Sequence, residues 1–368
     1  MGGTSPHPTL GQVRRVNPQI AFASLDRLPG RNQIVPSFIL ANGPVREARF
    51  VRNADGTADG GVHGLYTIAG RVDAPAACTT AQPNFAAALA ANNVIFRIPT
   101  PTFGLGLVDN TSEEQLTSRF ASTASQRAAF GIGGRFNRNG NDGSITRFGW
   151  KAQNKSLLIF SGEAYNVEQG VTNELFQNER GGDESCEANA TPEDHSHIFN
   201  GTSTVGTLTQ MSSDAVSFAN FMRLLAPPTT TINTASELNG QSLFNAVGCN
   251  LCHTTVMVTE EAQFTNQSGV TYHPFSDFAV HDMGTGLSDG VSQGNAGPRE
   301  FRSAPLWGAG QRIFFLHDGR AGPANGGILR AIQEHSSPGS EANTVISRFN
   351  NLLTPGQKQD ILNFLRAL

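Results

Sequence analysis

Charged side chains are scarce in this sequence, at 15 % of 368 residues against about a quarter in an average soluble domain. This scarcity excludes a solvated acidic or basic tail and a coiled coil. With 26 basic and 30 acidic residues the net charge is only −4. The composition therefore has no excess of positive charge that would favour binding to nucleic acid or to an anionic membrane. No apolar run approaches the roughly 18 residues of a membrane span. The 40 glycines, 19 prolines and 24 phenylalanines instead indicate a loop-rich globular protein with an aromatic core.

Cysteine is also scarce, with four in the whole chain, and two of them stand in one short motif. Cys249, Cys252 and His253 form the pattern C-x-x-C-H, which is typical of c-type haem attachment. Two thiols at this spacing add to the two vinyl groups of haem, and the adjacent imidazole binds the iron as an axial ligand. The motif therefore predicts one covalent haem c, with Cys249 and Cys252 as its attachment sites and His253 as an iron ligand.

Two other chemistries use closely spaced cysteines. A structural zinc site needs a second pair of ligands at similar spacing, but Cys78 and Cys186 are solitary. A thioredoxin-like redox pair needs a strand-then-helix setting and has no use for His253. Haem is the favoured interpretation. Cys78 and Cys186 themselves lie in polar, loop-like surroundings, where they either form a disulfide in an oxidising compartment or remain separate thiols.

The predicted secondary structure changes along the length of the chain. Short alternating stretches between glycine-rich turns predict strands over 48–52, 64–68 and 144–148, whereas helical patterns before residue 209 are sparse, over 84–91 and 112–125. Helical patterns dominate further on. We therefore expect an α+β protein with two domains: residues 1–235, a loop-rich region with short β-strands, and residues 236–368, a mainly α-helical cytochrome c domain.

Capping residues mark three helices in the second half of the chain. Ser213 and Asp214 begin a helix that ends before Pro227. Ser236 is expected to cap a second helix, which leads directly into Cys249. Thr354, followed by a proline, begins the last helix. The apolar positions of this last helix predict the buried residues Ile361, Leu362, Phe364, Leu365 and Leu368.

We expect a second iron ligand on a helical segment over 326–335. Ile328, Ala331, Ile332 and His335 share one face of this segment. Because a haem-binding domain must house the haem on such an apolar face, we predict that His335 is the sixth ligand of the iron. The alternative is that His335 is a buried residue held by ordinary hydrogen bonds.

Other side chains compete less well for the iron. His281 and Met283 are the rival ligands, with a glycine-containing loop after Met283. His317 precedes an aspartate and is expected to be a hydrogen-bonded turn residue. We expect the remaining candidates to lie at the surface: His63, His195, His197 and His273.

The order of several motifs resembles a known family. Residues 275–284 (FSDFAVHDMG), 299–308 (REFRSAPLWG) and 315–321 (FLHDGRA) are similar to motifs of the di-haem oxidoreductases, also named thiol oxidoreductases, which are relatives of bacterial di-haem cytochrome c peroxidases. Residues 147–152 (RFGWKA) and 168–176 (EQGVTNELF) also resemble that family. In the peroxidase relatives, a methionine or tyrosine in the helix after the HDG turn is the sixth ligand of the second haem. This resemblance places His335 at the same position.

Two departures from the family pattern affect the expected cofactor content. Family members carry a first C-x-x-C-H upstream of a segment similar to residues 2–6, so this chain has one covalent haem site where full-length relatives have two. Gln169 stands where the family often has a methionine. The start, MGGTSPHPTLGQ, has neither the basic nor the apolar region of a secretion signal. Either the signal has been removed or the chain begins inside a longer product.

These observations lead to three hypotheses about function. The first is a c-type haem protein with electron transfer activity, a haem-dependent oxidoreductase of the di-haem, peroxidase-like type. The second is a single-haem electron carrier, and the third is a non-catalytic scaffold with an ancillary haem. Because haem c is attached outside the cytoplasm, we expect a periplasmic or otherwise exported protein. The expected partner is a small redox donor or acceptor, such as another cytochrome, with no nucleic acid and no membrane span.

Overall fold

The structure is a computed structural model that describes residues 4–6, 13–16, 47–59, 85–178, 192–199, 209–264 and 266–368. The chain forms two units, each built from two separate stretches. The first unit contains Met1–Ile98 and Leu158–Phe221, and the second contains Pro99–Leu157 and Met222–Leu368. The boundary expected at residue 235 therefore falls inside the second unit. Residues 99–157 belong to the second unit because they pack into its core and pair with its strands. Local secondary-structure patterns along the sequence do not reveal such long-range contacts.

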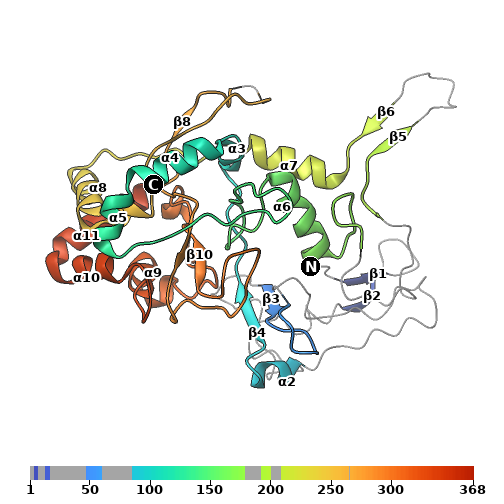
Figure 1. Cartoon of the computed structure of the whole chain (residues 1–368), viewed down its shortest axis with the longest axis horizontal. Helices are drawn as coiled ribbons and strands as arrows, with labels where there is room; N and C mark the ends of the chain where they lie inside the picture. Colours follow the sequence, from blue (N-terminus) through green and yellow to red (C-terminus); the bar gives the residue numbers. More distant parts are fainter. Residues whose placement is uncertain are drawn as a thin grey trace. The chain divides into compact units, whose positions relative to one another are not determined.

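Helices are the main regular elements of the second unit (Figure 1). They are α3 (Leu105–Asp109), α4 (Glu113–Ser122), α5 (Ala124–Phe130), α8 (Ala235–Val247), α9 (Gly327–Glu334), α10 (Asn343–Leu352) and α11 (Pro355–Ala367). Short strands form two antiparallel pairs, β7 (Met257–Val258) with β8 (Thr271–Tyr272) and β9 (Val280–Asp282) with β10 (Glu300–Arg302). Single 3₁₀ turns lie at Cys249–Leu251, Ala309–Gln311 and Pro323–Asn325.

Helices α8 and α11 lie side by side in the second unit (Figure 1). Both begin with a capping box, in which a threonine hydroxyl accepts from the third helical N–H and that residue's side chain accepts from the threonine N–H. Thr354 caps α11 as predicted. The cap of α8 is Thr234 and not Ser236, because Glu237 completes the box with Thr234, while the Ser236 hydroxyl donates to Asp360 of α11 at 2.5 Å.

The core of the second unit surrounds these two helices. Phe244 of α8 packs against Phe275 and Phe364, with ring centroids 6.3 and 5.4 Å away. Every residue predicted to be buried in α11 is buried. The full cluster also takes in Ile132, Val247, Leu251, Val345, Phe349, Ile361, Leu365 and Leu368, with Cys249 and Cys252 at its edge. The C-x-x-C-H motif therefore lies against the main apolar core.

Within its described residues, the first unit combines short strand pairs with three helices and a π-helical turn. Antiparallel pairs join β1 (Thr4–Pro6) to β2 (Val13–Val16), β3 (Glu47–Phe50) to β4 (Val94–Arg97), and β5 (His197–Phe199) to β6 (Thr209–Met211). The helical elements are α2 (Phe85–Ala90), most of α6 (Leu157–Ala164), the π-helical turn Tyr165–Gln169 and most of α7 (Asp214–Leu224).

Some of the elements expected from the sequence are confirmed, and others are not. The predicted strand over 48–52 corresponds to β3, and the predicted helices correspond to α2, to α7 and, over 112–125, to the successive helices α4 and α5. The segment 144–148 is not a strand: only isolated bridges hold it, Arg138 to Ile145 and Phe148 to Asn154, because tight turns close on both sides. The segment 64–68 lies outside the described residues. The α+β class is confirmed, with helices dominant. Within the described ranges, no helix is long and apolar enough to cross a membrane.

Candidate functional site

A large apolar cavity opens beside the C-x-x-C-H motif, entirely within the second unit. About 1460 Å³ of non-protein space lies between its walls, including its solvent-open mouth. Its walls come from the end of α8, from α9, α10 and α11, from β10, and from the segment before α6 that carries Trp150. Cys249, Cys252, His253 and His335 all line it, so the structure brings together the four residues singled out in the sequence.

The two cysteines are presented by a sharp change of chain direction after α8. Gly248 ends the helix in the left-handed region, at φ 102°, and the chain continues as the 3₁₀ turn Cys249–Leu251. The N–H of His253 donates to the carbonyl oxygen of Cys249 at 3.0 Å. This local turn places both thiols and the imidazole on the wall of the same cavity.

His253 is held with one ring nitrogen committed to the backbone. Its Nδ1–H donates to the carbonyl oxygen of Phe275 at 2.8 Å, which leaves Nε2 as the nitrogen with the lone pair. Burial lowers the pKa of His253 to about 4, so the ring is neutral at physiological pH. A neutral imidazole with its other nitrogen fixed by a carbonyl is the arrangement that metal-binding histidines adopt.

His335 has the same arrangement at the end of α9. Its Nδ1–H donates to the carbonyl oxygen of Ala331 at 2.7 Å, and burial lowers its pKa as well. Ile328, Ala331 and Ile332 line the cavity together with His335, which confirms the predicted helical face. His335 also lies close enough to His253 to disfavour a proton there. Two neutral imidazoles are thus available in one apolar cavity.

His281 differs because both of its ring nitrogens have carboxylate partners. Nε2 lies 3.0 Å from Asp277 and Nδ1 lies 2.9 Å from Glu341. Burial opposes protonation, but Cys252 and Asp277 outweigh it and raise the pKa of His281 well above its ordinary value. A cationic ring with both nitrogens engaged has no lone pair for a metal. Met283 also lines the cavity and stays a rival ligand to His335.

His317 lies in a turn, as expected, but its ring is buried in the cavity wall. Only 5 % of the residue is exposed, and the ring stacks on Phe301 with centroids 4.3 Å apart. The Nζ of the fully buried Lys151 lies 3.8 Å from the centroid of the same Phe301 ring. The sequence offered no signal for this arrangement, because Lys151 lies well over a hundred residues before Phe301 and His317.

Two arginines in the cavity wall were also missed. Arg302 of β10 and Arg312, just after the 3₁₀ turn Ala309–Gln311, both line the cavity. Burial lowers the pKa of each guanidinium to about 10. Arg302 lies in the segment 299–308 that resembles the family, but a motif match alone does not show that its side chain is buried.

The other residues singled out in the sequence lie elsewhere. His195 and His273 are exposed, as expected. Cys78, Cys186 and His63 lie outside the described residues, and so does the side chain of His197.

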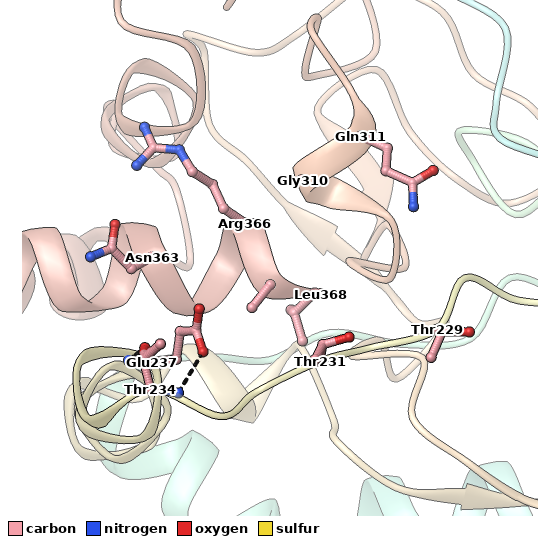
Figure 2. Close-up of a pocket in the computed structure, with 10 residues that line it drawn as sticks. Thr229, Thr231, Thr234, Glu237, Gly310, Gln311, Asn363, Arg366 and Leu368 are labelled. Carbon is pink, nitrogen blue, oxygen red and sulfur yellow. Dashed lines mark hydrogen bonds between the residues drawn. The ribbon is translucent and has the colours of Figure 1, made fainter.

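A second hollow lies at the start of α8 and is polar (Figure 2). Thr229, Thr231, Thr234 and Glu237 line one side of it, and residues near the chain's end line the other. Glu237 already accepts from the N–H of Thr234 at 2.9 Å as part of the capping box. The capping box of α8 therefore accounts for part of the lining of this hollow. None of the cysteines or histidines that line the first cavity lies here.

Comparison with protein families assigns the chain. The family described as "Di-haem oxidoreductase, putative peroxidase" matches residues 46–368. The chain belongs to this family. A family of di-haem oxidoreductases agrees with a cavity that holds a C-x-x-C-H motif and two neutral imidazoles. Comparison with curated protein sequences finds no match.

One solved structure that matches is described as Kuenenia stuttgartiensis hydrazine synthase pressurized with 20 bar xenon. It is 17 % identical over 44 % of this chain and 57 % of that chain, with a TM-score of 0.28. The match therefore spans little more than half of that chain's length.

Proposed function

We propose that this di-haem oxidoreductase family member holds one c-type haem in the cavity and acts as a haem-dependent, peroxidase-like oxidoreductase with electron transfer activity. The Cys249 and Cys252 thiols would form the two thioether bonds, and the Nε2 atoms of His253 and His335 would bind the iron. One observation carries the proposal: these four side chains line one apolar cavity, and each imidazole already has its Nδ1–H committed to a backbone carbonyl.

The residues of the cavity prepare it for haem by orienting the two imidazoles and by excluding water. The carbonyl oxygens of Phe275 and Ala331 fix the tautomer and orientation of the two imidazoles. The apolar side chains of α8, α9 and α11 limit access of water to the iron. When bound, the haem iron supplies one-electron redox chemistry, and a second imidazole ligand leaves no open position for a peroxide at this iron.

Turnover of a peroxide therefore requires a second, open haem. The di-haem family name agrees with this need. We propose that the haem of the second unit passes electrons to such a site. The electron donor would be a small redox protein, such as another cytochrome, and the compartment would be the periplasm, where haem c is attached.

Replacement of both cysteines tests the covalent site. The variant Cys249→Ala/Cys252→Ala is expected to lose all haem staining on a denaturing gel after production with haem-attachment machinery. The exposed residue His273, changed to Ala, serves as the control and should keep full staining. Staining that persists in the double cysteine variant would rule out thioether attachment at these positions.

A single-haem electron carrier is the second candidate, and it is favoured by the two matching imidazoles. It predicts a low-spin absorption spectrum in both redox states and no peroxide turnover. His335→Ala should convert the ferric spectrum to high spin and open the iron to added imidazole or cyanide, because one strong ligand is lost. A ferric spectrum unchanged in this variant would contradict ligation by His335 and favour Met283. Turnover of peroxide by the unmodified chain would favour the enzyme over the carrier.

A further inference from the structure

Two cations in the cavity wall lack a negatively charged partner. Arg302 is 6 % exposed, its Nη1 donates to the carbonyl oxygen of Arg147 at 2.8 Å, and its buried Nε has no hydrogen-bond partner. Arg312 lies near the ring of Phe315, 5.8 Å from the centroid. Neither guanidinium forms an ion pair with a carboxylate of the described residues.

Two other arginines of the second unit are neutralised by carboxylates. Arg320 pairs with Asp318 at 2.7 Å and with Glu334 at 3.3 Å, and Arg299 pairs with Asp282. Arg302, by contrast, feels the positive charge of Arg312, which adds to the effect of burial in lowering its pKa. The buried Arg302 and the partly buried Arg312 thus place two like charges in one wall without a counter-ion among the described residues, which is unfavourable. Such a pair is expected where an anionic group completes the site.

The cavity is proposed to receive haem, whose periphery has both apolar and anionic parts. Vinyl groups suit the cysteines, whereas the two propionates are carboxylates that need cationic or N–H partners. A guanidinium presents its donors in a fork that matches a carboxylate. Arg302 still has donors to offer beyond its bond to Arg147, and the guanidinium of Arg312 forms no hydrogen bond recorded among the described residues.

We propose that Arg302 and Arg312 bind the propionate carboxylates of the haem. This inference rests on the proposed haem attachment at Cys249, Cys252 and His253. The arginines are positioning residues that also set the charge around the iron. Their positive charges disfavour the ferric state, which carries one more positive charge than the ferrous state, and so raise the reduction potential. They also keep the propionates ionised, because an adjacent cation lowers the pKa of a carboxyl group.

Potentiometric titration of the haem-loaded protein between pH 5 and 8 tests the proposal. Arg312→Gln and Arg302→Gln should each shift the reduction potential downward, and the potential should depend more steeply on pH because propionate protonation moves into this range. Arg312→Lys, which keeps the charge, should restore most of the potential. Arg320→Gln is the matched control and should leave the potential unchanged, because Arg320 lies outside the cavity wall and has its own carboxylate partners.

Arg312→Gln is the decisive variant, since Arg302→Gln also removes the bond to Arg147 and can disturb folding. Haem staining on a denaturing gel accompanies each measurement. Absence of staining in the unmodified chain would defeat the haem proposal itself. Full staining with an unchanged potential and pH profile in Arg312→Gln would overturn only the propionate assignment. A potential that responds to added phosphate in the unmodified protein but not in the Gln variants would assign the pair to a dissociable anion, which also overturns it.

Discussion

A single carbonyl oxygen determines which atom of His253 is available for chemistry. Because Phe275 accepts from Nδ1, the lone pair is on Nε2, and the buried ring stays neutral. The same rule applies to His335 through Ala331. His281 lies in the same cavity wall but has two carboxylate partners and favours its charged form. Hydrogen-bond partners therefore give three histidines of one cavity wall different preferred protonation states.

The low pKa of His253 predicts how the haem-free chain responds to acid. In the unfolded chain the imidazole binds a proton near pH 6.5, whereas in the folded chain it does so only near pH 4. The unfolded state therefore binds more protons between these values. The contribution of His253 to the free energy of unfolding should be constant above pH 6.5 and fall by up to about 3 kcal/mol between pH 6.5 and pH 4.

Urea unfolding of the haem-free chain at pH 7.5 and pH 4.5 measures this effect. His253→Asn keeps an N–H donor for Phe275 but does not titrate, so it should lose most of the His253 contribution to the pH dependence. His335, which has a lowered pKa as well, remains in both proteins and contributes equally. An identical loss of stability in both proteins would show that His253 is not the responsible group.

The contact between α8 and α11 depends on one position without a side chain. A Cβ added at Gly240 of α8 would lie 2.0 Å from the carbonyl oxygen of Asp360 in α11. The two helix backbones can approach this closely only because Gly240 has none. The contact matters for the site, since α8 leads directly to Cys249 and α11 forms part of the cavity wall.

Gly240→Ala should therefore force α8 and α11 apart and reduce the free energy of unfolding by about 1–3 kcal/mol, the usual cost of overpacking a core. Chemical denaturation followed by circular dichroism measures the change. Gly356→Ala, in the first turn of α11, is the control, because nothing lies within 4 Å of the added Cβ. It should be neutral or stabilise by up to about 1 kcal/mol. Equal effects of the two substitutions would contradict a close helix contact at Gly240.

At the scale of the whole molecule, each unit is made of two stretches that are far apart in the chain. Residues 99–157 supply Ile132 and Trp150 to the cavity wall. Arg135 and Val280 exchange both backbone hydrogen bonds, at 3.0 and 2.8 Å, which fixes this stretch against β9. The cavity wall therefore depends on residues well before the C-x-x-C-H motif.

Two fragments test this dependence. Residues 99–368 should unfold cooperatively and retain stained haem, because they include every residue of the cavity wall. Residues 236–368 should show a broad or absent thermal transition and lose haem to proteolysis, because the apolar surface normally covered by Ile132 and its neighbours is exposed. Circular dichroism melts of both fragments measure the difference. A shorter fragment as stable as the longer one would mean that residues 99–157 are dispensable for this fold.

The sequence by itself determined the features that depend on short-range geometry. The spacing of Cys249, Cys252 and His253 identified the motif, the cap at Thr354 located α11, and the 3.6-residue period placed His335 with Ile328 and Ile332 on one face. Each of these depends on residues within a few positions of one another. Local hydrogen bonds and helical periodicity are therefore sufficient to predict them.

Only the tertiary structure decided which distant groups meet. It joined residues 99–157 to the second unit and gave His281 a partner in Glu341 sixty residues away. It also placed Arg302 and Arg312 in one cavity wall, where neither forms an ion pair with a carboxylate of the described residues. It also replaced the expected cap Ser236 with Thr234, because Ser236 is engaged by Asp360 of another helix. Contacts of this kind follow from the packing of the whole core, whose energy is shared among many side chains and has no signature in any single stretch of sequence.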